Sequence, residues 1–147
     1  MQIQDEILTT PLIEAVKCGD FEACQQILQC DSVFHIDQRN FQKQTALLVA
    51  ARLGHLTICE LLLDNGASLN RLFPTVTSLR KRFCCYSDTP LIVATRNGHE
   101  DICRLLLERG ADITITDNIF MTPASIALLY NHIKIYEMLI DHSLKKN

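Results

Sequence analysis

A six-residue pattern that starts with threonine occurs four times in this chain of 147 residues. The copies read TPLIEA, TALLVA, TPLIVA and TPASIA, and they start at Thr10, Thr45, Thr89 and Thr122. Nine residues after each threonine stands a residue that tolerates a left-handed backbone, namely Gly19, Gly54, Gly98 and Asn131. Each copy therefore predicts a short helix that is capped near the threonine and ends at the glycine or asparagine.

A second apolar stretch follows each of these turns. It reads ICELLL at 58–63, ICRLLL at 102–107 and IYEMLI at 135–140, with a weaker copy, ACQQIL, at 23–28. The chain thus predicts four units, each made of a helix, a turn and a second helix. One such unit cannot bury its apolar side alone, so neighbouring units must stack on one another to form a core.

These motifs identify a family resemblance. The Thr-Pro-Leu-x-x-Ala motif, the Gly-His turns at 54–55 and 98–99, and the Leu-Leu-Leu-x-x-Gly-Ala-x tail resemble the ankyrin repeat. The resemblance covers roughly residues 5–147 and implies an all-α solenoid of helix–turn–helix units with short β-turn fingers. It predicts a single domain, 1–147, with repeats at approximately 5–39, 40–83, 84–116 and 117–147.

The spacing of the copies locates an insertion. Successive threonines are 35, 44 and 33 residues apart, whereas the family period is about 33 residues. The pattern stays in register from Thr45 to Asn70, so the additional residues between repeats two and three must lie within 71–88. We therefore expect an extended finger in this segment, at the place where the family joins consecutive repeats by a hairpin.

The chain departs from the family pattern at the turn of each finger. The glycine that normally stands two residues before the threonine is replaced by Leu8, Lys43, Ser87 and Phe120. A residue with a side chain at this place either strains the turn or changes its type.

Composition excludes several classes of protein. With 48% apolar residues the chain is too apolar to be largely disordered, and its net charge of −3 excludes a chain that clamps duplex nucleic acid by charge alone. No apolar run approaches the roughly 20 residues of a membrane span, and the amino terminus lacks a secretory signal. Since the seven cysteines are an odd number, we expect reduced thiols and a cytoplasmic location.

The cysteines and histidines fall mostly at repeat-equivalent positions. Cys24, Cys59 and Cys103 share one position of the second helix, and His55, His99 and His132 share a position beside the turn. We interpret the thiols as small buried hydrophobic groups and the imidazoles as structural, because equivalent positions in stacked units lie too far apart to share a metal. No nucleophile, phosphate-loop or zinc motif occurs. We expect no enzymatic activity, no cofactor and no metal.

The predicted extended finger carries a local positive charge, with four basic and no acidic side chains in residues 71–82. Three interpretations are open: a solvated loop, an arm that binds a protein partner, and contact with an anionic membrane or nucleic acid. Cys84 and Cys85, which follow the basic cluster, would suit an acylated anchor in the last case.

The resemblance implies a protein partner that binds the concave face formed by the fingers and the first helices. Candidate basic binding residues are Arg52, Arg71, Arg80, Lys81, Arg82 and Arg96, and candidate apolar ones are Phe41, Phe83, Tyr86, Ile119, Phe120 and Tyr130. Aromatic side chains beside arginine are the usual composition of binding hot spots. We expect an adaptor or inhibitor that is a monomer when free. The alternative is a peripheral module that contacts acidic lipid or nucleic acid through residues 71–82.

Three residues are candidates for modification. Cys84 and Cys85 are the possible acylation sites. Asn70 ends a segment that is similar to the one that asparaginyl hydroxylases modify in ankyrin repeats; the other interpretation is an asparagine whose side chain fixes the hairpin.

Overall fold

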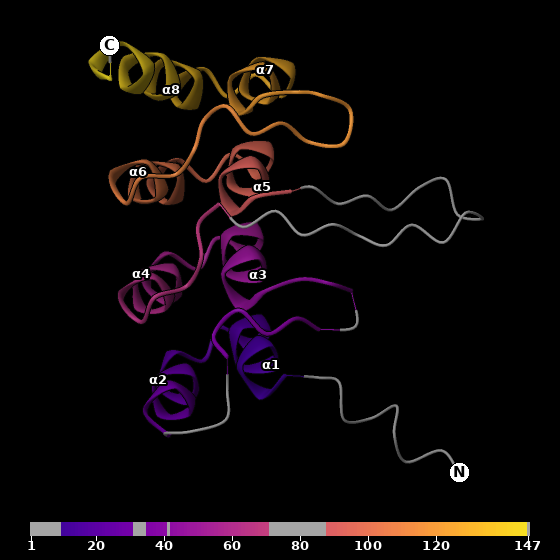
Figure 1. Ribbon diagram of the computed structural model, residues 1–147, viewed down its shortest axis with the longest axis vertical. Helices are drawn as coiled ribbons and strands as arrows, with labels where there is room; N and C mark the ends of the chain where they lie inside the picture. The colour runs from indigo at the N-terminus through magenta and orange to yellow at the C-terminus, as the bar shows by residue number, and fades with distance from the viewer. Residues whose placement is uncertain (1–9, 31–34, 41, 71–87, 147) are drawn as a thin grey trace, which may run out of the picture. The chain divides into compact units, whose positions relative to one another are not determined.

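The computed structural model describes residues 10–30, 35–40, 42–70 and 88–146. Over these residues the chain forms eight helices and no strand (Figure 1). The helices are α1 (Pro11–Cys18), α2 (Phe21–Gln29), α3 (Ala46–Leu53), α4 (Leu56–Asp64), α5 (Pro90–Asn97), α6 (Glu100–Glu108), α7 (Pro123–Leu129) and α8 (Ile133–Lys145). They follow the predicted order of helix, turn and helix, which confirms the all-α repeat architecture.

The repeated threonine caps the first helix in three of the four copies. The Oγ1 atoms of Thr45, Thr89 and Thr122 each accept a hydrogen bond of 3.3 Å from the backbone N–H three residues further along. This satisfies one of the donors that a helix start leaves without an intrahelical partner. Thr10 is the exception, because its Oγ1 is buried and has no hydrogen-bond partner.

The predicted left-handed residues end the same helices. Gly19, Gly54 and Gly98 have φ angles of 70°, 83° and 75°, and Asn131 takes the equivalent place after α7 with φ at 60°. Gly19 and Gly98 each lie beside a histidine ring, so there is also a steric reason for glycine at these two positions. A Cβ on Gly98 would lie 2.7 Å from the His132 ring, and one on Gly19 would lie 3.2 Å from the His55 ring. These imidazoles therefore pack on the turn of the preceding repeat, as their structural interpretation requires.

The chain divides into two compact units, Met1–Ser68 and Leu69–Asn147. In the first unit the α1–α2 pair packs against the α3–α4 pair, and in the second the α5–α6 pair packs against the α7–α8 pair (Figure 1). Large side chains that are fully buried fill each core: Ile13, Leu47, Ile58 and Leu62 in the first unit, and Leu91, Ile102, Leu106, Ile126 and Ile135 in the second.

Candidate functional site

A short finger, residues 117–121, precedes α7 and is held by its own first residue. The Asp117 N–H donates to the Met121 carbonyl over 3.0 Å, and the Phe120 N–H donates to the Asp117 carbonyl over 3.1 Å. The Asp117 carboxylate also accepts from the N–H groups of Ile119 and Met121, at 3.0 and 2.9 Å. Because Asp117 is buried, these bonds are shielded from water and fix the shape of the finger.

Phe120 occupies the place of the missing finger glycine in a left-handed conformation, with φ at 64°. Lys43, at the same place in the second repeat, also has φ at 64°. At these two fingers the backbone therefore takes the strained left-handed conformation, which is the first of the two outcomes expected from the sequence. Leu8 and Ser87, for which the same was expected, lie outside the described residues. The Phe120 side chain is 87% exposed, so no burial within this chain offsets the strain. Strain of this kind is a reason to look for function at the residue.

Arg96 links the base of this finger to the start of α5. Its guanidinium lies 2.8 Å from Asp88 and 3.4 Å from Asp117. The hydrogen bond to Asp88 is the main cause that raises the pKa of Arg96. Because two largely buried carboxylates pair with this cation, Arg96 helps to hold the finger in place.

Exposed apolar residues also lie at the end of α7, on the side of the fourth repeat that carries the finger. Leu129 and Tyr130 lie 33 residues after Arg96 and Asn97, at equivalent positions, and both are exposed. Because Arg96 reaches the finger base from its position on α5, Leu129 occupies the corresponding side of α7. The Tyr130 ring stacks on His132, with ring centroids 6.3 Å apart. We call Ile119, Phe120, Leu129 and Tyr130 the finger-side surface.

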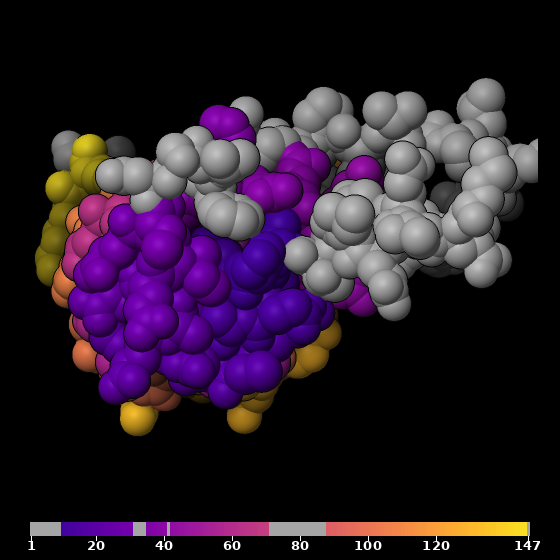
Figure 2. Space-filling view, turned by 90° about the horizontal axis from the view of Figure 1, so that it is seen from below, coloured from indigo at the N-terminus to yellow at the C-terminus, as the bar shows by residue number. Residues whose placement is uncertain are grey.

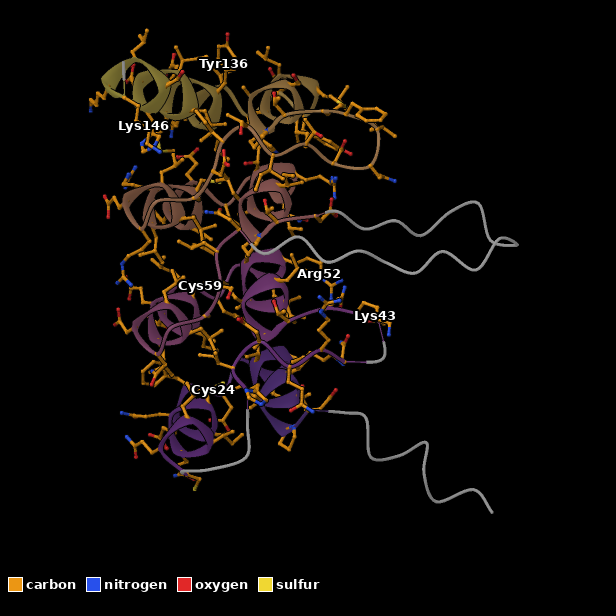
Figure 3. All side chains as sticks on the ribbon, in the orientation of Figure 1. Cys24, Lys43, Arg52, Cys59, Tyr136 and Lys146 are labelled. Atoms are coloured by element: carbon orange, nitrogen blue, oxygen red, sulfur yellow. The ribbon has the colours of Figure 1, made fainter. Side chains whose placement is uncertain are left out.

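In the first unit the equivalent side is more polar. Arg52 is exposed near the end of α3, followed by the exposed Leu53. Figure 3 shows Arg52 on the side of this unit from which the finger with Lys43 projects. The predicted binding residue Arg52 is therefore accessible to a partner.

Many of the candidates from the sequence lie outside the described residues. They are Phe41, Arg71, Arg80, Lys81, Arg82, Phe83, Cys84, Cys85 and Tyr86. The interpretations of the basic segment 71–82 and of acylation at the cysteine pair stay predictions.

Asn70 joins two loops of the second unit. Its side-chain oxygen accepts from the Asp112 N–H at 2.8 Å, and its amide nitrogen donates to the Gly110 carbonyl at 3.4 Å. These bonds fit the interpretation of a structural asparagine, although the loop that it fixes belongs to the next repeat. The carboxylate of Asp37 makes the equivalent link in the first unit, accepting from the N–H of Ser68 at 3.0 Å and from its hydroxyl.

The three repeat-equivalent thiols have the properties of core residues, whereas Cys18 and Cys30 are exposed. Cys24, Cys59 and Cys103 are fully buried, which confirms their interpretation. Burial raises the pKa of Cys59 to about 12 and that of Cys103 to about 11, so both stay protonated at neutral pH. Among the described residues no group of three or more His, Cys, Asp or Glu side chains is placed to hold a metal.

One groove outside the finger side lies between α2 and α4 of the first unit. It has a volume of about 320 Å³ and is lined by Phe21, Thr57, Glu60, Leu61 and Asp64. Its two carboxylates stand one helical turn apart on α4, and no histidine, thiol or cation lines it. No helix in the part of the chain that the structure describes is long and apolar enough to cross a membrane.

Two family models match the chain, and both describe ankyrin repeats. The model for three copies matches residues 1–73 and 80–147, and the model for many copies matches residues 47–107. The interruption of the first match falls inside 71–88, where the spacing places the insertion. No curated protein matches the chain.

Proposed function

The chain belongs to the ankyrin-repeat family, whose repeats generally bind other proteins, and on this premise we propose that it is a non-enzymatic adaptor or inhibitor. Its partner binds the finger-side surface of the fourth repeat, and Arg52 of the first unit is a separate candidate contact. We propose that it acts in the cytoplasm, where its odd number of cysteines would stay reduced.

The exposure of Phe120 at the tip of the finger is the observation that best supports this proposal. Phe120 is a large aromatic side chain, 87% exposed, at the tip of a finger whose backbone is fixed by Asp117. A rigid finger loses little conformational freedom when a partner covers it, so more of the contact energy appears as affinity. Aromatic anchors of this kind usually contribute most of the energy of an interface.

Arg52 and the basic segment 71–82 have a different role in the proposal. Exposed charges mainly steer the encounter and set the association rate, whereas buried anchors set the dissociation rate. Arg52 and the basic residues 71–82 would therefore attract a partner with an acidic surface. Arg96 would contribute chiefly through the position of the finger that it holds.

The experiment captures the partner from a lysate with the full chain as bait and identifies it by mass spectrometry. The purified partner is then measured by surface plasmon resonance against Phe120→Ala. We expect dissociation to become about 30-fold faster, which corresponds to a hot spot of about 2 kcal/mol. Glu108→Ala is the matched control, because Glu108 is exposed on α6, away from the finger. Loss of binding by the control with retention by Phe120→Ala would show that the face is wrongly assigned.

The alternative function, contact with acidic lipid or nucleic acid, is favoured by one observation, the four basic and no acidic residues of segment 71–82. Such binding weakens steeply as salt rises. Co-sedimentation with phosphatidylserine vesicles and retention on single-stranded DNA, each at low and at high salt, distinguish it from protein binding. Strong, salt-sensitive binding that Phe120→Ala leaves unchanged would favour the alternative.

A further inference from the structure

The groove between α2 and α4 lies on the outer side of the first unit. Figure 1 shows these two helices side by side, on the side of the unit away from its finger. Four residues line the groove from α4, and Phe21, the first residue of α2, lines it from the other wall. The four follow one another at spacings that share one face of a helix, and they are Thr57, Glu60, Leu61 and Asp64. The groove shares no residue with the finger-side surface.

Two apolar side chains give this groove a place for an apolar group. Phe21 is 40% exposed, and Leu61 is half-buried. The volume of about 320 Å³ is at the lower end of the roughly 300–1,000 Å³ that ligand pockets occupy. This space suits one or two side chains of a peptide, and it is small for a cofactor.

An ion pair bridges the equivalent place in the second unit. Glu100 is the first residue of α6 and Lys134 is the second residue of α8, the positions that Phe21 and Thr57 hold in the first unit. The Lys134 Nζ lies 3.5 Å from the Glu100 carboxylate. An aromatic ring and a hydroxyl stand at these two positions in the first unit, and they cannot pair by charge. The open groove therefore depends on the side chains of the first unit and is not a general property of the repeat.

The helices that form the groove are acidic. α2 and α4 contain three acidic residues, Glu22, Glu60 and Asp64, and no Lys, Arg or His, whereas α6 and α8 both include cations. The unit Met1–Ser68 carries four basic and nine acidic side chains. A surface of this charge attracts cationic partners and repels the phosphate groups of lipids and nucleic acids.

We propose that this groove binds a basic amphipathic segment of another protein. An apolar side chain of the segment occupies the space between Phe21 and Leu61, and a Lys or Arg one helical turn away pairs with Glu60, which is exposed. Burial of the apolar side chain supplies affinity, and the opposite charges steer association and fix the orientation. Figure 2 looks onto α1 and α2, which form the visible surface of the first unit, so a partner can approach α2 from this end. The proposal does not depend on the finger-side surface.

The test measures the binding of synthetic peptides to the full chain by fluorescence anisotropy. The probe is a short labelled peptide in which leucines form one face of a helix and lysines fill the other positions. One reference peptide has glutamate in place of lysine, and a second has serine in place of leucine. We expect saturable binding of the probe, with both reference peptides bound at least about 10-fold more weakly.

Matched variants of the chain locate the binding. Glu60→Lys should weaken the probe by about 10-fold or more, whereas Glu108→Lys, the same change at an exposed residue of α6, should change its affinity by less than about 2-fold. Phe21→Ala should also weaken the probe by about 10-fold. Ile133→Ala, which truncates the exposed first residue of α8, should leave the affinity unchanged. In the ¹⁵N-labelled chain, the amide shifts that the probe causes should concentrate in α2 and α4.

Circular dichroism first checks that each variant keeps its helix content; if Phe21→Ala does not fold, Glu60→Lys still decides, because Glu60 is exposed. A probe that shows no saturable binding up to about 1 mM would overturn the proposal. So would equal weakening by Glu60→Lys and Glu108→Lys, or equal binding of the serine peptide, since either result means attraction by charge alone. A chain that self-associates in sedimentation equilibrium, and that Glu60→Lys returns to the mass of one copy, would assign the groove to a second copy and overturn the proposal as well.

Discussion

Replacing Phe120 by glycine should stabilise the protein while weakening its binding to the partner. Phe120 stands in the left-handed region, at a turn position where a side chain is strained. Glycine adopts this conformation without a steric penalty. The substitution therefore separates the cost of the backbone conformation from the contribution of the aromatic ring.

The magnitude follows from three terms. A left-handed residue with a Cβ costs roughly 1–2 kcal/mol. Glycine returns about 0.5–1 kcal/mol of this because it gives the unfolded chain more freedom. The ring is 87% exposed, so its removal takes little burial from the fold. The free energy of unfolding should rise by about 0.5–1 kcal/mol in Phe120→Gly.

The assay is urea unfolding, monitored by circular dichroism, with Phe120→Ala as the matched control. Alanine keeps the Cβ and with it the strain, so its stability should match the wild type within about 0.5 kcal/mol. Both variants should lose partner affinity. The reasoning is refuted if alanine stabilises as much as glycine, or if glycine destabilises the fold.

Three further outcomes are expected. Asp117→Ala should lower the free energy of unfolding by about 2–4 kcal/mol in urea, because the N–H groups of Ile119 and Met121 lose the buried carboxylate that accepts their hydrogen bonds. Asp117→Asn, which matches the equivalent Asn40, should lower it by about 1 kcal/mol, and equal losses would contradict this account. Leu106→Ala should cost about 2–5 kcal/mol, and an unchanged thermal melt would show that the assigned register is wrong. At pH 7 a thiol reagent should label Cys18 far faster than Cys103. Because the folded-state pKa of Cys103 is about 11 against an ordinary 9.0, the stability it contributes should be present below pH 9 and lost as pH rises towards 11; equal labelling or a flat pH profile would count against its burial.

The helices and their turns were predictable because they depend on local chemistry. A threonine cap, an apolar helix and a left-handed residue act within a few positions of one another, so a repeated spacing predicts them together. The burial of Cys103 was predictable for the same reason, since the alignment of repeats placed it on a packed face. The spacing alone predicts the insertion within 71–88, which stays a prediction because residues 71–87 lie outside the described part of the chain.

The links between loops were not predictable, because their partners are far apart in the sequence. Asn70 bonds to Asp112, and Asp37 bonds to Ser68. The sequence did contain a signal for these bonds, because the acceptors Asn70 and Asp37 stand at equivalent positions of their repeats. This signal can be interpreted only once the loops are known to be in contact. The ion pairs of Arg96 with Asp88 and Asp117 were missed in the same way.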